Sequence, residues 1–293
     1  MDKPAGFTSH DVVARARRIL GIRQIGHFGT LDPFATGVLP LSIGKATRFA
    51  QFYLKSRKSY EGAIRFGVAT DTYDATGRPS GEPAEVDLTA AEIEHVFAQL
   101  TGRRLQTPPP FSAKRVAGTR AYKLARQQKP VDLKPVEVEI YALELLSFEA
   151  EVARFAVECS GGTYVRSLAH EIGGKLGCGA HLAGLRRTAV AEFTEAQSAT
   201  LEKLDEAAKA GEAGRLLIPL EALLPQFPEL MVRGGEEKSI RHGHRFELAQ
   251  VARLSGQPAR PPSLLKILNA DRRLIAVARH VEGAIYHPGL VLV

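Results

Sequence analysis

The chain contains no tryptophan, and only two cysteines and two methionines occur among its 293 residues. Cys159 and Cys178 are too few for a disulfide framework, and no spacing of cysteine and histidine is typical of a zinc site. The first residues are polar, and no apolar run approaches the roughly 18 residues that span a membrane. We therefore expect a cytoplasmic protein that needs no membrane, metal or cofactor.

Positive charge is what the chain has in excess, with a formal net charge of +7. Residues 1–58 contain ten basic and three acidic residues, so this stretch alone has a net charge of +7. Such a basic block favours a polyanionic partner, nucleic acid first, although a solvated basic face is an equally common explanation. With 44% hydrophobic and 24% charged residues the composition is that of a globular protein, and the length suggests about two domains.

Hydrophobic periodicity predicts interspersed helices and strands in the first part of the chain. Ser9 is expected to cap the first helix, and Thr89 with Glu92 forms a capping box at the start of another. We expect helices over 9–20, 89–102, 122–127, 164–176 and 201–210, strands over 59–67, 136–148, 151–160 and 186–193, and long loops over 68–86 and 103–118. Because strands and helices do not alternate as in a parallel sheet, we predict an α+β fold with a mixed or antiparallel sheet.

The character of the sequence changes after Pro225. Short apolar segments separated by turn residues predict a small β-rich domain over residues 229–293. Its strands are expected over 264–268, 274–279 and 290–293. We therefore divide the chain into a first domain over 1–225 and a second over 229–293.

Asp32 is a single carboxylate in a segment, residues 26–40, that is too glycine-rich for an ordinary strand. Pro33 favours an extended backbone at Asp32, and the glycines allow another molecule to approach closely. Asp before Pro is also a common turn signal, which is the plainer interpretation. The apolar neighbours Leu31 and Phe34 are expected to draw Asp32 partly inside, where a charged carboxylate needs a cation or donors. The segment is thus a candidate for a catalytic nucleophile or base.

The sequence of residues 26–40, Gly-His-Phe-Gly-Thr-Leu-Asp-Pro-Phe-Ala-Thr-Gly-Val-Leu-Pro, resembles the catalytic motif of the bacterial TruB-type tRNA pseudouridine-55 synthases. Further stretches similar to this family follow in the family's order at residues 2–9, 70–77, 109–114, 162–168 and 185–187. The family has a short apolar strand before its Asp-Lys-Pro, whereas this chain starts at Met1-Asp2. Either preceding residues are missing or the edge of the sheet is built differently.

The resemblance implies an enzyme that isomerises uridine 55 in the T-loop of tRNA to pseudouridine without a cofactor or a metal. It implies an α+β catalytic domain over 1–225 with a mixed or antiparallel sheet, and a β-rich, PUA-like RNA-binding domain over 229–293. The expected partner is the T-arm of tRNA, and the protein is expected to be a monomer.

The resemblance also assigns roles to six side chains of this sequence. Asp32 is implied to be the essential carboxylate, and Arg166 is implied to pair with it. Tyr60 is implied to stack on the target base and is a candidate for handling the C5 proton. The remaining implied contacts are those of the pocket residues Tyr164 and Leu185, and of His27 against the flipped-out nucleotide. Without the resemblance, Tyr60, Tyr164 and Leu185 are interpreted as core residues and His27 as a loop residue.

Two other functional classes remain possible from the sequence. A non-catalytic RNA-binding or tRNA-folding protein on the same scaffold is the main alternative, although an intact set of Asp32, Tyr60 and Arg166 favours an enzyme. A hydrolase with Asp32 as nucleophile is weaker, because no second carboxylate lies in the same motif. The sequence leaves open whether the carboxylate attacks the sugar, attacks the base or removes a ribose proton.

Overall fold

The computed structural model describes residues 1–112, 114–116, 118–127, 129, 131–248 and 261–292. The chain forms two compact units. The first consists of Met1–Ile43 and Phe49–Lys209, and the second consists of Gly44–Arg48 and Ala210–Val293. Among the described residues, no helix is long and apolar enough to cross a membrane.

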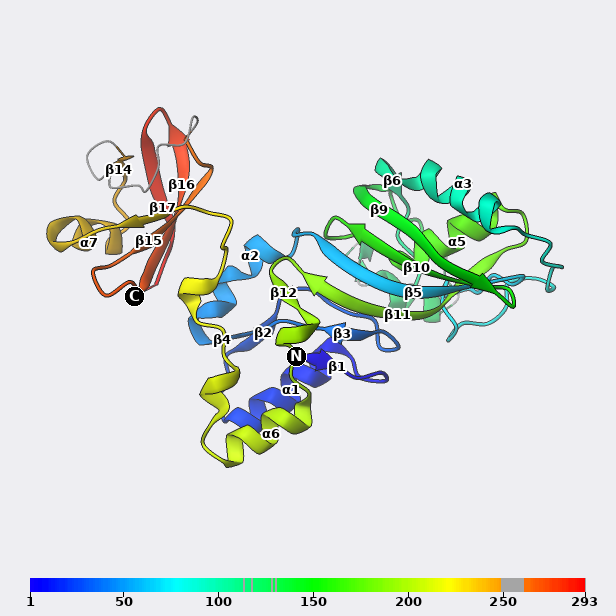
Figure 1. The fold of residues 1–293 in the computed structure, drawn as a ribbon, viewed down its shortest axis with the longest axis horizontal. Helices are drawn as coiled ribbons and strands as arrows, with labels where there is room; N and C mark the ends of the chain where they lie inside the picture. Colours follow the sequence, from blue (N-terminus) through cyan, green and yellow to red (C-terminus); the bar gives the residue numbers. More distant parts are fainter. Residues whose placement is uncertain (113, 117, 128, 130, 249–260, 293) are drawn as a thin grey trace. The chain divides into compact units, whose positions relative to one another are not determined.

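The first unit is built on an eight-stranded sheet. Its strands are β1 (Asp2–Lys3), β3 (Thr36–Val38), β5 (Lys58–Phe66), β6 (Gly102–Gln106), β9 (Val136–Glu149), β10 (Val152–Cys159), β11 (Ala180–Val190) and β12 (Phe193–Thr194). Seven of them follow the order β1-β3-β11-β5-β10-β9-β6, and β12 pairs with β11 (Figure 1). The β3–β11 pair is parallel, whereas β5, β9 and β10 pair in antiparallel fashion. The predicted α+β fold with a mixed sheet is confirmed.

Helices and the loop that carries Asp32 surround this sheet. The helices are α1 (Ser9–Leu20), α2 (Ala50–Tyr53), α3 (Ala90–Leu100), α4 (Ala121–Arg126), α5 (Val165–Lys175) and α6 (Leu201–Lys209), and the short strand pairs are β2 (Ile25–His27) with β4 (Leu41–Ile43) and β7 (Arg115–Val116) with β8 (Thr119–Arg120). Helix α3 lies against β9, α5 lies against β11, and α1 contacts α6 (Figure 1). One core cluster joins Phe97 of α3, Leu168 of α5, Phe155 of β10 and Leu31. The hydrophobic core therefore connects the sheet directly to the segment around Asp32.

The start of α1 differs from the prediction by one residue. Thr8, not Ser9, is the N-cap, and its side chain accepts a hydrogen bond from the backbone N of Asp11. The backbone N of Thr8 donates in turn to the carboxylate of Asp11. Ser9 is the first helical residue and is buried, with its hydroxyl turned to the backbone of Leu31. Either residue can cap a helix, so the sequence alone does not separate them. The predicted capping box of Thr89 and Glu92 is present at α3.

The short strands β1, β3 and β12 were not predicted separately, and β6 and β11 also differ from the prediction. Strand β6 occupies part of the predicted loop over 103–118 and pairs with β9, Gly102 opposite Ile140. It is a short edge strand followed closely by three prolines, which obscured its alternation of exposed Leu105 and buried Gln106. Strand β11 begins at Ala180 rather than at residue 186, because it pairs with β5 from Phe66 onward.

The second unit is rich in β-structure, as predicted. It contains β13 (Glu229–Met231), β14 (Phe246–Glu247), β15 (Leu264–Leu268), β16 (Leu274–Glu282) and β17 (Ile285–Val291) in the sheet order β13-β15-β16-β17-β14. The strand predicted over 290–293 is the end of β17, and residue 293 lies outside the described residues. A helix, α7 (Gly234–Arg241), was not predicted within this β-rich domain; its Ile240 belongs to the core of this unit.

Candidate active site

The loop between β2 and β3 holds Asp32 through its two neighbours. The backbone N of Leu31 donates to Ser9 Oγ at 2.8 Å, and Ser9 Oγ donates to Leu31 O at 3.2 Å. On the other side, the carbonyl of Pro33 accepts a hydrogen bond from the buried Nζ of Lys3 at 3.1 Å. The residues on each side of Asp32 are therefore anchored to the N-terminal segment, which restricts where the carboxylate can lie.

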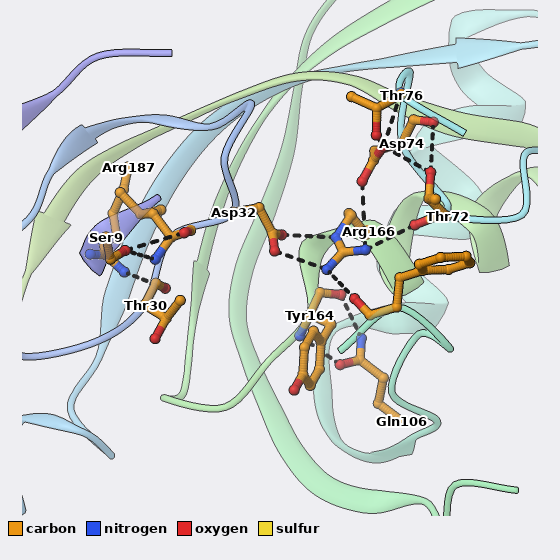
Figure 2. A network of polar contacts seen from close by, with 12 residues as sticks. Ser9, Thr30, Asp32, Thr72, Asp74, Thr76, Gln106, Tyr164, Arg166 and Arg187 are labelled. Carbon is orange, nitrogen blue, oxygen red and sulfur yellow. Dashed lines mark hydrogen bonds and ion pairs between the residues drawn. The ribbon is translucent and has the colours of Figure 1, made fainter. Parts of the chain in front are cut away.

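A fully buried arginine supports the same loop. Arg187 of β11 donates from Nε to Val38 O at 2.8 Å, from Nη2 to Gly29 O at 3.0 Å and from Nη1 to Thr30 O at 3.4 Å (Figure 2). Strand β3 also approaches β11 closely, since a Cβ on Gly37 would lie 2.3 Å from Arg187 O. The loop is thus bound to the sheet at both of its ends.

We expect Arg187→Met to lower the free energy of unfolding by about 3 kcal/mol, because three carbonyls lose a donor in a dry interior. Urea unfolding followed by tyrosine fluorescence measures this change. Arg186→Met is a matched control, because the neighbouring side chain is 40% exposed and forms surface ion pairs with Asp2 and Glu195; its expected cost is below about 1 kcal/mol. Equal losses in the two variants would contradict a supporting role for Arg187.

Asp32 forms an ion pair with two hydrogen bonds to Arg166, the second residue of α5. Arg166 Nε donates to Asp32 Oδ2 at 2.8 Å, and Nη2 donates to Asp32 Oδ1 at 2.9 Å (Figure 2). The arginine side chain is 5% exposed, whereas that of Asp32 is 34% exposed. The structure therefore supplies the cation that a partly buried carboxylate needs, and it leaves one side of that carboxylate accessible.

A second carboxylate, Asp74, lies against the same arginine. Its Oδ2 is 3.5 Å from Arg166 Nη1, and its side chain is 6% exposed. Asp74 Oδ1 accepts hydrogen bonds from Thr72 Oγ1 at 2.8 Å, Thr76 N at 3.0 Å and Thr76 Oγ1 at 2.5 Å (Figure 2). Arg166 also donates to the carbonyls of Thr72 at 3.0 Å and Phe111 at 3.1 Å. Each nitrogen of the guanidinium therefore has a partner, which sets its orientation toward Asp32.

The ion pair faces a pocket of about 290 Å³. Its lining combines the charged groups with aromatic rings and hydroxyls: Asp32, Pro33, Phe34, Thr72, Asp74, Thr76, Phe111, Tyr122 and Arg166. Apolar walls with a few converging polar groups are typical of small-molecule sites. Among the described residues, no three histidine, cysteine or acidic side chains converge as a metal site would require.

Two of the tyrosines singled out in the sequence lie within electrostatic range of Asp32. Burial raises the pKa of Tyr60 to about 12; the nearby charge of Arg187 opposes this shift, and the charge of Asp32 adds slightly to it. Burial likewise raises the pKa of Tyr164, with a smaller contribution from Asp32. The backbone of Tyr164 is held by Gln106, whose Oε1 accepts from Tyr164 N at 2.8 Å and whose Nε2 donates to Tyr164 O at 3.1 Å. Both tyrosines are thus neutral phenols at physiological pH.

The other two expected contact residues flank the loop. Leu185 lies on β11 opposite Gly62 of β5 and packs against the core of the first unit. His27 ends β2, and its Nδ1 accepts a hydrogen bond from Gly29 N at 3.3 Å. Burial and the nearby charge of Arg187 lower the pKa of His27, so its ring is uncharged at neutral pH. Leu185 and His27, like the two tyrosines, lie outside the lining of the pocket at Arg166.

Three residues of this site were missed in the sequence. Asp74 lies in a stretch of threonine, aspartate and glycine that resembles an ordinary turn. Arg187 follows Arg186 on β11, and an inward position in the strand alternation was the available signal. Gln106 carried no signal, because it lies in the strand predicted as a loop.

Stability is expected to depend on pH through a buried amine. Lys58 is 5% exposed and donates to three backbone carbonyls within residues 53–56. Burial lowers the pKa of Lys58 to about 8, well below the value near 10.4 of an unfolded chain. The unfolded state therefore binds more protons above about pH 8, and stability rises with pH there. Cys159, whose pKa burial raises to about 11, has the opposite effect above about pH 9.

We expect the free energy of unfolding to rise by about 1 kcal/mol between about pH 7.5 and about pH 9. Chemical denaturation at a series of pH values measures the slope. Lys58→Met should reduce the slope in this window without abolishing it, because burial also lowers the pKa of Lys3 to about 8 and that amine still titrates. A stability that falls with pH in the wild type would contradict the burial of Lys58 as a charged group at neutral pH.

Solved structures share this architecture. A chain of the crystal structure of a Cbf5-Nop10-Gar1 complex matches with a TM-score of 0.75 and 28% identity, covering 97% of this chain and 78% of that chain. A chain in the structure of an H/ACA RNP bound to a substrate RNA containing 2'-deoxyuridine matches with a TM-score of 0.75 and 26% identity, covering 100% of this chain and 83% of that chain. This chain therefore shares the fold of these two chains.

Sequence comparisons identify the family. The model of the TruB family pseudouridylate synthase N-terminal domain matches residues 17–165, and that of the tRNA pseudouridylate synthase B C-terminal domain matches residues 166–225. The tRNA pseudouridine synthase B of Solibacter usitatus (strain Ellin6076) is 46% identical over 292 residues, covering 100% of this chain and 98% of the relative. That of Aquifex aeolicus (strain VF5) is 43% identical, covering 84% and 85%. This chain belongs to the TruB family.

Proposed function

We propose that the protein isomerises uridine 55 in the T-loop of tRNA to pseudouridine, with Asp32 as the essential carboxylate. The observation that carries the proposal is the two-bond ion pair of Asp32 with the buried Arg166 at an accessible pocket. Relatives at 40–46% identity are named tRNA pseudouridine synthase B. The net charge of +7 suits a polyanionic substrate.

The reaction breaks the N1–C1′ bond of uridine, turns the base over and joins C5 to C1′. The C5 proton then leaves and N1 carries a proton, so the product is an isomer of the substrate. A carboxylate at the sugar or at the pyrimidine edge is the group this sequence of steps needs. The two hydrogen bonds from Arg166 orient Asp32, which a nucleophile or a base requires before any bond is broken.

Tyr60 is proposed to stack on the target base and to handle the C5 proton. A phenol with a pKa of about 12 is neutral, so it offers an uncharged aromatic wall to the base. The nearby positive charge of Arg187 stabilises the phenolate form, and this makes Arg187 the group that would assist proton acceptance by Tyr60.

The remaining contacts concern the flipped-out nucleotides. A uridine inside a folded RNA loop must leave its stack, and apolar or aromatic walls offset the lost stacking. Tyr164 and Leu185 are proposed as such walls, and His27 is proposed to contact the extruded part of the loop. Because the ring of His27 is neutral, its contribution would be shape and hydrogen bonding rather than charge.

Residues 229–293 are proposed to form a PUA-like RNA-binding domain that follows the catalytic domain over 1–225. The supporting observations are the five-stranded sheet of the second unit and its exposed basic side chains Arg233, Lys238, Arg245, Arg272, Arg273 and Arg279. We further propose that the protein acts on the T-arm as a monomer, in the cytoplasm, where tRNA is modified.

The test is tritium release from tRNA transcripts labelled at uridine C5. Stoichiometric release from the native transcript, and none from a transcript with cytidine at position 55, is the expected result. Release from both transcripts would reject position 55 as the target. Tight binding of tRNA without release would favour a non-catalytic RNA-binding protein.

A further inference from the structure

Two aromatic rings stack next to the Arg166 network, and neither has a role in the function proposed above. Tyr73 and His170 lie with ring centroids 3.9 Å apart and ring planes 9° from parallel. Tyr73 stands between Thr72 and Asp74, which both contact Arg166. His170 follows Arg166 by four residues on α5, so the two side chains project from the same side of the helix.

The backbone of Tyr73 has an unfavourable conformation. Its φ angle is 65°, in the left-handed region that normally selects glycine or asparagine. Such strain persists only where the surroundings enforce it, and it often marks a position under functional constraint. A bulky aromatic residue at this position therefore needs a reason, and the stacking partner on α5 supplies one.

The stack attaches the loop over residues 70–77 to α5, whereas the backbone of this loop is attached to the sheet. Leu182 N of β11 donates to Tyr73 O at 3.0 Å, and Ala75 N donates to Leu182 O at 3.0 Å. These two bonds hold the residues on each side of Asp74 to β11. The ring of Tyr73 reaches α5 instead, one turn beyond Arg166, and so it ties the loop to the helix that carries the arginine.

The interaction at His170 is a stack of neutral rings. Burial lowers the pKa of His170, and its Nδ1 is buried without a hydrogen-bond partner among the described residues. The orientation of the imidazole is therefore set by its contact with Tyr73 more than by hydrogen bonding. Stacked aromatic pairs prefer a defined geometry, which suits a spacer between a loop and a helix.

We propose that Tyr73 and His170 form a positioning pair that aligns Arg166 with Asp32. The pair holds the loop at a set distance from α5, so that Asp74 and the carbonyl of Thr72 restrain Nη1 while Nε and Nη2 face the catalytic carboxylate (Figure 2). Neither ring is a catalytic residue, because each acts through Arg166. This inference rests on the proposed function of the Asp32 site and adds two residues to it.

Tyr73→Gly is the main test, because glycine accepts the left-handed backbone and removes only the ring. We expect the single-turnover rate of tritium release to fall about tenfold, as small misalignments in active sites do. The KM for tRNA and the melting temperature should not worsen, since Tyr73 belongs neither to the core cluster of the first unit nor to the residues proposed to contact RNA. His170→Ala should have the same effect on rate.

Three variants complete the design. Tyr73→Phe and His170→Phe retain stacked rings and should keep near wild-type rates. Ala150→Gly is the control for the backbone change, because Ala150 in the β9–β10 turn also has a left-handed φ angle, 48°. It should leave the rate unchanged. Retention of the full rate in both Tyr73→Gly and His170→Ala would overturn the proposal, as would an equal loss in Tyr73→Phe.

A second readout separates this inference from the proposed reaction. The Nε proton of Arg166 is bonded to Asp32, and its exchange with water can be followed by NMR. We expect faster exchange in Tyr73→Gly than in the wild type or Tyr73→Phe. If the wild type released no tritium, the proposed function would fail, while unchanged exchange in Tyr73→Gly would refute the positioning pair alone.

Discussion

Asp32→Asn is expected to abolish tritium release from uridine C5 while leaving tRNA binding within a few-fold of the wild type. An amide is neither a nucleophile nor a base, and we expect a loss of at least about 1,000-fold in rate. The shape of the side chain is preserved, and Asp32 is 34% exposed, so the fold should tolerate the change. The two measurements are single-turnover tritium release and a filter-binding titration with the same tRNA.

Asp71→Asn is the matched control for this experiment. Asp71 lies on the same loop as Asp74 but is exposed, and its carboxylate accepts a hydrogen bond from the backbone N of Arg78. Asp71→Asn likewise replaces a carboxylate by an amide, within the loop that borders the site. We expect this variant to release tritium at the wild-type rate. Full activity in Asp32→Asn would remove Asp32 from the mechanism. Loss of tRNA binding in that variant would instead assign it a role in recognition.

Arg166→Met should cost both activity and stability. The variant leaves Asp74, which is 6% exposed, as a buried carboxylate without its cation. Removing one partner of a buried pair typically costs about 3–5 kcal/mol, and the rate should fall by at least about 100-fold because Asp32 loses its orientation. Arg166→Lys keeps the charge but not the two-bond geometry, so it should recover part of the stability and little of the rate.

The double variant Arg166→Met/Asp74→Asn separates the two effects. Asparagine can still accept the hydrogen bonds from Thr72 and Thr76, but it brings no uncompensated charge into the interior. We expect stability to recover by about 2 kcal/mol relative to Arg166→Met alone, with the rate still low. Paired urea unfolding and tritium-release measurements test this. A double variant as unstable as the single one would show that Arg166 stabilises the fold through its carbonyl contacts rather than through charge.

Local signals predicted the long elements of the fold well. The capping box of Thr89 with Glu92 and the periodicity over 9–20 correspond to α3 and α1, and the pairing of residues 136–148 with 151–160 corresponds to β9 and β10. The failures included the short elements β1, β3, β6, β12 and α7, and the first half of β11. Strand β6 is an edge strand whose pairing with β9 overrides the weak tendency of its own residues.

The sequence by itself determined that the chain has a mixed α+β unit, a C-terminal β-rich unit, and an unusual carboxylate in a glycine-rich loop. These features depend on residue type and spacing within a few turns or strands, so a linear pattern contains them. The family resemblance already implied that Arg166 pairs with Asp32, although the two lie 134 residues apart along the chain. The tertiary structure alone decided the other groups of the site, such as Arg187, which binds the same loop and lies 149 residues from Val38. Asp74 and the Tyr73–His170 stack join them because sheet register and helix packing, not local propensity, set those distances.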